Sequence, residues 1–284
     1  MNIHDLKLFE AVVFHGNFTK AADAMHTVQS NVTARIKALE ETFDAQLLSR
    51  SPRKVSLTIA GEKLLYYSKQ INHLLEEARH EIRSAGQVVG ELKIGCIETT
   101  LALKVPGMIN QFATEYPDVL LEFKSGFPGD LAQDVLHYKL DAAFVSAPID
   151  IPELEERHVK KDKLVLITAA NTDIKTVLAA KAVRVVVFDQ GCSYRGRLEA
   201  WLSARGVSRY TCTIMNTMEG IVNFVEAGVG ISVLPEDLVK QFYGRRKLNT
   251  FPLGRGLDTL STVLIYRKDV PQSAALKAFV ALYK

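Results

Sequence analysis

The stretch 18–43, FTKAADAMHTVQSNVTARIKALEETF, restricts the folds open to this chain more than any other part of it. Two short helical patterns meet there at a tight break around His26 and Thr27. The first is rich in alanine, so another helix can cross closely over it. The second has an apolar stripe on one face and polar side chains on the other. This order is typical of a helix-turn-helix, whose second helix lies in the major groove of DNA. The alternative is an ordinary helical hairpin inside a core.

The second helical pattern separates apolar from polar residues by face. Its apolar stripe consists of Val32, Ile36, Leu39 and Phe43. The opposite face carries side chains that can reach base edges and phosphates, and it has no acidic residue before Glu40. The residues of this polar face are Gln29, Ser30, Thr33, Arg35 and Lys37. We predict that they contact DNA, together with Thr19 and Lys20 of the first helical pattern.

Flanking signals set the ends of these helices. The spacing of Leu6, Phe9 and Val13 predicts a preceding helix that ends at Gly16. Asn17 and Thr27 are then expected to be the N-caps of the two following helices, because their side-chain oxygens can accept from free backbone N–H groups.

A basic hairpin is expected after the polar-faced helix. Two strand-like runs, 47–50 and 55–57, flank the turn Ser51-Pro52-Arg53-Lys54. Such a hairpin is a wing, and Arg53 and Lys54 lie where a wing meets the DNA backbone or minor groove. A structural hairpin with a solvated tip is the alternative. The position directly after a polar-faced helix favours DNA contact.

A long amphipathic helix follows from about residue 59 to 85, with Thr58 as its cap. Its apolar residues recur at a spacing of three to four and need a partner surface. They are Leu64, Tyr67, Ile71, Leu74, Leu75, Ala78 and Ile82. Packing on its own domain is one explanation. We favour a dimerising linker helix, because paired DNA-binding domains gain affinity and site length.

The remaining chain alternates between strand and helix patterns. Strand-like runs begin near 90, 119 and 140, with helical segments between them, and a second cycle starts near Lys163. Such alternation predicts parallel sheets in an α/β domain. Two similar halves indicate a bilobed fold with a cleft between them.

Composition sets the remaining limits. The length of 284 residues suits two or three domains, and 48% apolar residues can form a sizeable core. A net charge of +3 allows a local basic patch on a balanced chain. The odd count of three cysteines without metal-ligand spacing favours a reducing cytosol. We expect a cytoplasmic protein with no metal, cofactor or membrane span.

The motifs together resemble those of the LysR-type transcriptional regulators. The similarity covers essentially the whole chain and is most specific over 18–61; GVGISVLP and LDAAFV also match family landmarks. The resemblance implies a winged helix-turn-helix (1–58), a linker and dimerisation helix (59–87) and a periplasmic-binding-protein-like effector domain (88–284). Within the last, one lobe would comprise 88–161 and 268–284, and the other 162–267. It also implies a homodimer or homotetramer that binds double-stranded DNA.

The recognition segment departs from the family pattern at one place. Members usually have Ser-Arg in the middle of the recognition helix, whereas this chain has Thr33-Ala34 followed by Arg35. Thr33 can still bind a phosphate, but the base preference of the family does not transfer. Gln29 can pair with adenine, and Arg35 reaches a phosphate or lies on the flank.

A small polar effector is expected where strands end and helices begin, because helix N-termini present free N–H groups there. Polar residues follow several predicted strands. These are Glu98, Thr99, Thr100, Ser125, Ser146, Cys192, Ser193, Tyr194, Arg195 and Thr217. Each could be a plain N-cap, but the set suggests a lined cleft.

The charge of the effector is left open between an amine, an amino acid and a carboxylate. Glu98, with Asp189 and Glu219 in support, favours an amine, whereas Arg195 favours an acid. The segment 192–201 is similar to a subgroup that includes putrescine-utilisation regulators, which favours an amine or an amino-acid-like effector.

Cys192 supports a second interpretation. A helix N-terminus and nearby Arg195 would lower the pKa of its thiol and make it a redox sensor. An enzyme with Cys192 as nucleophile lacks a base, and the chain has no phosphate-binding, dinucleotide or zinc motif. A solute-uptake module conflicts with the DNA-reading segment. We therefore predict a regulator and not an enzyme.

Overall fold

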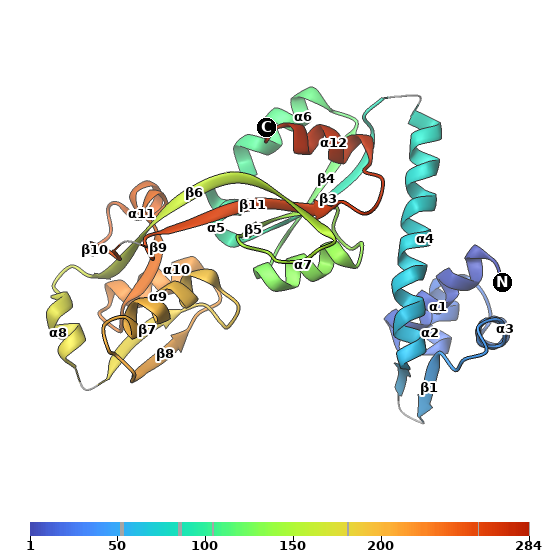
Figure 1. Cartoon of the computed structure of the whole chain (residues 1–284), viewed down its shortest axis with the longest axis horizontal. Coiled ribbons are helices and arrows are strands. Elements are labelled where there is room, and N and C mark those ends of the chain that lie inside the picture. The colour runs from blue at the N-terminus through green and yellow to red at the C-terminus, as the bar shows by residue number, and fades with distance from the viewer. Residues whose placement is uncertain (52–53, 85–86, 104, 181, 255, 284) are drawn as a thin grey trace. The chain divides into compact units, whose positions relative to one another are not determined.

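The computed structural model describes residues 1–51, 54–84, 87–103, 105–180, 182–254 and 256–283. The chain divides into two compact units, Met1–Ala85 and Gly86–Lys284 (Figure 1). Among the described residues, none of the helices combines the length and the apolar character that crossing a membrane requires.

The first unit begins with three helices and a hairpin. Asn2 starts the first helix in a capping box: it accepts from the Asp5 N–H at 2.9 Å, and Asp5 accepts from the Asn2 N–H at 2.7 Å. The helix ends at Gly16 with φ 60°, as predicted. The elements are α1 (Ile3–His15), α2 (Phe18–Ala24), α3 (Gln29–Thr42), β1 (Leu48–Ser51) and β2 (Lys54–Leu57).

Helix caps follow the sequence prediction in one case and not in the other. Asn17 caps α2 by accepting from the Lys20 N–H, as predicted. The prediction for Thr27 is wrong, because α3 begins after Val28, whose side chain makes no capping bond. The Thr27 hydroxyl instead accepts from the side-chain amide of Asn31 at 2.9 Å.

The core of the first unit comes from one face of each helix. Buried residues include Phe9, Ala21, Val32, Ile36 and Leu39. The small Ala21 and Ala22 side chains lie in this core, which agrees with a close helix crossing at α2. Phe43 departs from the predicted stripe: it is 44% exposed, because α3 has already ended.

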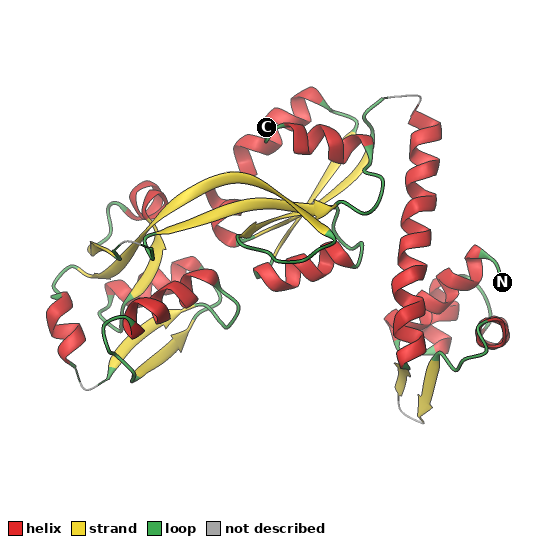
Figure 2. Ribbon diagram, in the orientation of Figure 1, coloured by secondary structure: helices red, strands yellow, loops and turns green. Residues whose placement is uncertain are grey.

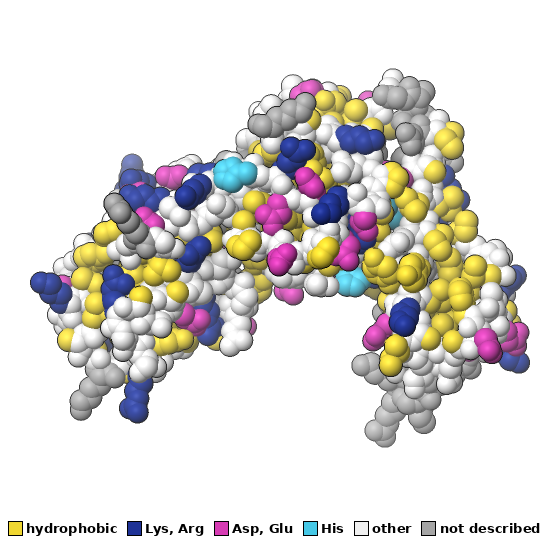
Figure 3. Space-filling model, viewed as in Figure 1, with side chains coloured by type: hydrophobic (Ala, Val, Ile, Leu, Met, Phe, Trp, Pro, Cys, Tyr) yellow, Lys and Arg dark blue, Asp and Glu magenta, His cyan; other side chains and the backbone are white. Residues whose placement is uncertain are grey.

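A long helix, α4 (Ile59–Ser84), follows the hairpin. Thr58 caps it by accepting from the Gly61 N–H at 3.0 Å, as predicted. One face packs on α1, where Ser68 and Asn72 both donate to the Glu10 carboxylate. Another face exposes apolar side chains, with Tyr67 58% exposed and Ile82 82% exposed (Figure 3).

Gly61 permits the close approach of α4 to the hairpin. A Cβ atom added at Gly61 would lie 2.1 Å from the carbonyl oxygen of Leu47. No side chain fits at that distance, so the packing of α4 against Leu47, the residue before β1, requires glycine here.

The second unit contains two lobes built on parallel strands. In lobe I, β3 pairs in parallel with β4 and with β5, and helices cover both faces of the strands (Figure 2). Phe112, Phe144 and Phe279 form the centre of one core, and Leu131 and Val135 lie in the core on the opposite face. The elements are β3 (Gly90–Cys96), α5 (Glu98–Leu103), α6 (Val105–Glu115), β4 (Val119–Ser125), α7 (Pro128–Leu136), β5 (Ala142–Ser146) and α12 (Ala274–Ala281).

Lobe II repeats the strand–helix alternation. β7 and β8 are parallel, and the Trp201 side chain of α9 is buried in the core beneath them. The elements are α8 (Ile174–Ala179), β7 (Val183–Val187), α9 (Ser193–Ser203), β8 (Tyr210–Ile214), α10 (Met218–Glu226), β9 (Ser232–Pro235), α11 (Glu236–Tyr243) and β10 (Leu248–Pro252).

Two long strands join the lobes. β6 (Leu154–Ala169) and β11 (Thr259–Arg267) are antiparallel, and β11 continues beside β5 in lobe I while β6 continues beside β9 and β10 in lobe II. The predicted parallel pairing therefore holds within the lobes but not for this antiparallel connection between them. The predicted strand from Lys163 covers only the second part of β6, because residues 155–162 are mostly charged and lack apolar alternation.

Candidate DNA interface and effector pocket

The polar face of α3 is exposed at its N-terminal half. Gln29 and Ser30 begin the helix, and Lys37 lies two turns further along with its side chain 75% exposed. The Thr33 hydroxyl donates to the Gln29 carbonyl oxygen at 3.0 Å, so its lone pairs stay available to a donor. Gln29, Ser30, Thr33 and Lys37 therefore form one outward surface.

Contacts with α2 orient the start of this surface. The Thr19 hydroxyl donates to the side-chain oxygen of Gln29 at 3.2 Å. This bond leaves the Gln29 amide group free to donate. Thr19 therefore lies beside the α3 surface, and Lys20 follows it in the exposed first turn of α2.

Arg35 has a different role from the other predicted DNA contacts. Its guanidinium lies 3.5 Å from the buried carboxylate of Asp5 on α1. The Arg35 side chain is 47% exposed and reaches across to α1, on the flank of the polar face. Of the hairpin residues, Arg53 lies outside the described residues, and Lys54 is placed only by its backbone in β2.

A pocket of about 400 Å³ lies between the lobes of the second unit. Its polar residues come from the carboxyl ends of parallel strands, as the sequence predicted from general sheet geometry. The lining comprises Ile97, Glu98, Thr99, Leu101, Ser125, Gly126, Phe127, Pro128, Ser146, Phe188, Cys192, Ser193, Tyr194, Asn216 and Thr217.

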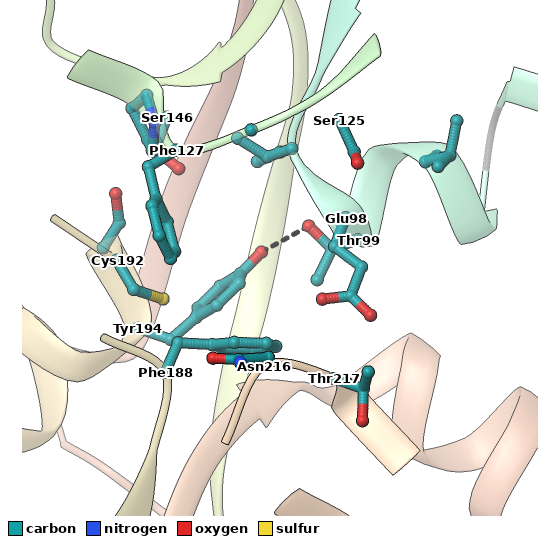
Figure 4. Close-up of a pocket in the computed structure, with 15 residues that line it drawn as sticks. Glu98, Thr99, Ser125, Phe127, Ser146, Phe188, Cys192, Tyr194, Asn216 and Thr217 are labelled. Atoms are coloured by element: carbon teal, nitrogen blue, oxygen red, sulfur yellow. Dashed lines mark hydrogen bonds between the residues drawn. The ribbon is translucent and has the colours of Figure 1, made fainter. Parts of the chain in front are cut away.

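Hydrogen bonds cross this pocket from one lobe to the other. The hydroxyls of Thr99 in lobe I and Tyr194 in lobe II are 2.7 Å apart and buried (Figure 4). The backbone N–H of Met218, at the start of α10 in lobe II, donates to the Glu98 carboxylate of lobe I at 3.2 Å. Burial raises the pKa of Glu98, and the Met218 bond offsets part of that rise.

Two predicted effector residues lie outside this pocket. Thr100 is buried at a separate small cavity, which is also lined by Thr99, Leu103, Lys160, Asp162 and Thr262. Arg195 is turned away: its Nε donates to Glu199 at 2.9 Å, and its Nη2 lies 3.9 Å from the Cys212 sulfur. Arg195 lies in the first turn of α9, next to Ser193 and Tyr194 of the pocket lining, but its side chain leaves the cleft and contacts Glu199 one turn further along the helix.

The supporting acids also lie elsewhere. Asp189 is 4.0 Å from the Arg195 guanidinium, and Glu219 pairs with Arg246 at 3.0 Å. Neither carboxylate lines the pocket.

Sequence reasoning missed the apolar wall and one amide. Ile97, Leu101, Phe127 and Phe188 supply the wall, and Asn216 lies beside Thr217. Their only sequence signal was their position next to the predicted strand ends. An apolar residue there is equally compatible with the core.

The predicted activation of Cys192 is wrong. Burial raises the pKa of its thiol, and the backbone N–H groups of Tyr194 and Arg195 together with the Arg195 charge compensate only in part. A thiol that resists ionisation reacts slowly.

The described residues also contain no group of three or more His, Cys, Asp and Glu side chains suited to hold a metal.

Comparison with known proteins finds a matching family model for each of the two units. Residues 3–62 match the family model of the bacterial regulatory helix-turn-helix proteins of the lysR family, and residues 85–284 match that of the LysR substrate binding domain. The chain belongs to the LysR-type family of DNA-binding transcriptional regulators.

Relatives match over nearly their whole length. The chain is 36% identical over 280 residues to the "Uncharacterized HTH-type transcriptional regulator YusT" of Bacillus subtilis (strain 168), covering 99% of this chain and 94% of the relative. Among solved structures, it resembles a full-length OxyR variant from Pseudomonas aeruginosa (TM-score 0.74, 20% identity, 99% of this chain and 94% of that one). Full-length CbnR complexed with its target DNA gives a TM-score of 0.69 at 21% identity, with 100% and 99% covered.

Proposed function

We propose that the pocket between the lobes binds a small-molecule effector and that its occupancy changes how paired DNA-binding units are arranged on DNA. The observation that carries this proposal is the set of interlobe hydrogen bonds inside the pocket, Thr99 to Tyr194 and Met218 to Glu98. A ligand that contacts residues of both lobes favours one lobe arrangement over another. Such differential binding is the physical requirement for an allosteric response.

We propose further that α3 enters the major groove. Gln29, Ser30, Thr33 and Lys37 form the surface that would face the bases and phosphates. Thr19 and Lys20, and the hairpin residues Arg53 and Lys54, would contact the phosphate backbone beside it. Arg35 supports this surface through Asp5 and is assigned no base contact.

The exposed apolar face of α4 is the proposed pairing surface. Tyr67, Ile71, Leu74 and Ile82 are exposed at helical spacing, and a second copy of the same helix would cover them. A homodimer or homotetramer would then present two or more copies of α3. Paired half-sites follow from this symmetry.

Selection from a randomised DNA library tests the proposal. The full-length protein should enrich duplexes with two half-sites related by two-fold symmetry, with centres a whole number of helical turns apart. A footprint should cover both. Enrichment of a single short site, or of none, would contradict the proposed arrangement.

A further inference from the structure

We infer that the effector is a cationic amine with an apolar body, that its ammonium group pairs with Glu98, and that Glu98 selects against carboxylates. The inference rests on the proposed effector pocket and names the chemical class that it accepts.

The charge inside the pocket is negative. Glu98 is the one charged side chain among the described residues that line it. The nearby Arg195 could have balanced an acid, but its guanidinium is held by Glu199 and lies outside the lining. An anionic ligand would therefore meet a like charge with no side-chain cation to offset it.

The Glu98 carboxylate also occupies the position in the pocket where an anion would be most favourable. The start of a helix attracts negative charge through its free N–H groups. At α10, the Met218 N–H already donates to Glu98, and the Gly220 N–H donates to the Thr217 hydroxyl. The carboxylate that an acidic ligand would bring to this place is already supplied by the protein.

The Glu98 carboxylate retains capacity for a ligand. A carboxylate can accept about four hydrogen bonds, and the described contacts of Glu98 include the one from Met218. Figure 4 shows the Glu98 carboxylate, the Tyr194 ring and the Thr217 side chain lining the same pocket. A primary ammonium has three donors, and the hydroxyls of Ser125 and Ser146 and the oxygen of Asn216 lie around the same pocket.

The walls of the pocket indicate the rest of the ligand. Ile97, Leu101, Phe127 and Phe188 present apolar surface, and the Tyr194 ring lines the same pocket. Burial of an alkyl or aryl group against these side chains removes apolar area from water. A ligand that carries one positive charge and an apolar body therefore satisfies the lining, whereas a zwitterionic amino acid would leave its carboxylate without a cation.

A matched series of probes tests the assigned charge. Phenethylamine, 2-phenylethanol, 3-phenylpropionate and phenylalanine share an aryl body and differ in their charged groups. Hexylamine and hexanoate repeat the comparison with a flexible body. Calorimetry on the full-length protein should give affinities in the order amine, alcohol, then acid and amino acid.

Two variants make the test specific. Glu98→Gln keeps an acceptor for Met218 and removes the charge, so it should weaken amine binding about tenfold to a hundredfold and reduce discrimination against the acid. Asp130→Asn removes an exposed acid in the first turn of α7, outside the pocket lining, and should leave every affinity unchanged.

Other outcomes would overturn the inference. These are equal or tighter binding of either acid, no binding of either amine at millimolar concentration, or an unchanged amine affinity in Glu98→Gln. DNA binding, measured by mobility shift on the same samples, reports on the regulator separately. If the pocket does not select by charge but the protein still binds DNA, the amine inference is rejected and the proposed function stands. If the protein does not bind DNA, the proposed function itself is rejected.

Discussion

The polar face of α3 and the effector pocket, the two proposed binding surfaces, are assembled in opposite ways. The first comes from a single helix whose residues are neighbours in sequence, held outward by the packing of Val32 and Ile36 on the inner side. The second comes from separate loops of two lobes, and its side chains bond to each other across the gap. Substitutions on α3 should therefore have nearly independent effects, whereas substitutions of pocket residues should have coupled effects.

The largest effect is expected for a substitution that destabilises only one of the two units. Gly61→Val would force a side chain against the Leu47 carbonyl oxygen and should destabilise the DNA-binding unit by about 2–4 kcal/mol. Hydrogen exchange on the full chain should show faster exchange in α1–α4 and unchanged protection in β3–β5. Gly129→Ala is the control, because its added Cβ has no neighbour within 4 Å. Equal loss of protection in both units would remove the basis for treating them separately.

Substitution of Gln29 tests the independence of the α3 surface. Gln29→Ala should lose about 1–3 kcal/mol of discrimination at one base pair, because the variant cannot make the proposed bidentate contact with adenine. Binding to selected and randomised duplexes measures this difference. Arg35→Ala should lower affinity for both duplexes alike, through the lost Asp5 contact. A sequence preference altered by Arg35→Ala and untouched by Gln29→Ala would reverse the assignment.

The interlobe bond tests the coupling of the pocket. Tyr194→Phe or Thr99→Val should each cost about 1–2 kcal/mol of stability, because the buried partner hydroxyl loses its hydrogen bond. The double variant should cost less than the sum of the two single changes. Denaturant unfolding measures the cycle. Strict additivity would indicate that the two hydroxyls do not interact.

The smallest effect concerns the thiols. Burial raises the pKa of Cys192 and raises that of Cys96 to about 12, whereas Cys212 is exposed. Because only the thiolate reacts, and a raised pKa moves its formation to higher pH, alkylation at neutral pH should modify Cys212 first. Mass spectrometry over time measures the order. Preferential labelling of Cys192 would restore the redox interpretation.

The same contrast explains what the sequence could predict. The end of α1 and the start of α2 depend on neighbouring residues, so Gly16 and Asn17 could be predicted from residue type and spacing, whereas the N-cap of α3 could not. The polar strand ends of the pocket were found because parallel strands share one edge. Features that are set by residues close together in the sequence can therefore be predicted from it.

Features that depend on distant packing escaped prediction. The charged first part of β6 is a strand because β11 pairs with it from Leu154 to Lys163, and nothing in its own residues indicates that. The direction of Arg195 depends on Glu199, and the burial of Cys192 depends on packing against two hydrophobic clusters. Phe127 and Phe188 line the pocket for the same reason.

The route of the chain through β6 and β11 has a consequence for synthesis on the ribosome. Lobe II lies between these strands in sequence, so its parallel strands and helices are all made before the chain returns to lobe I. Lobe I, although begun first, needs β11 beside β5 and the buried Phe279 of α12 against Phe112 and Phe144. Lobe II can therefore fold while the nascent lobe I still exposes its apolar face, and lobe I is the half that would need a chaperone.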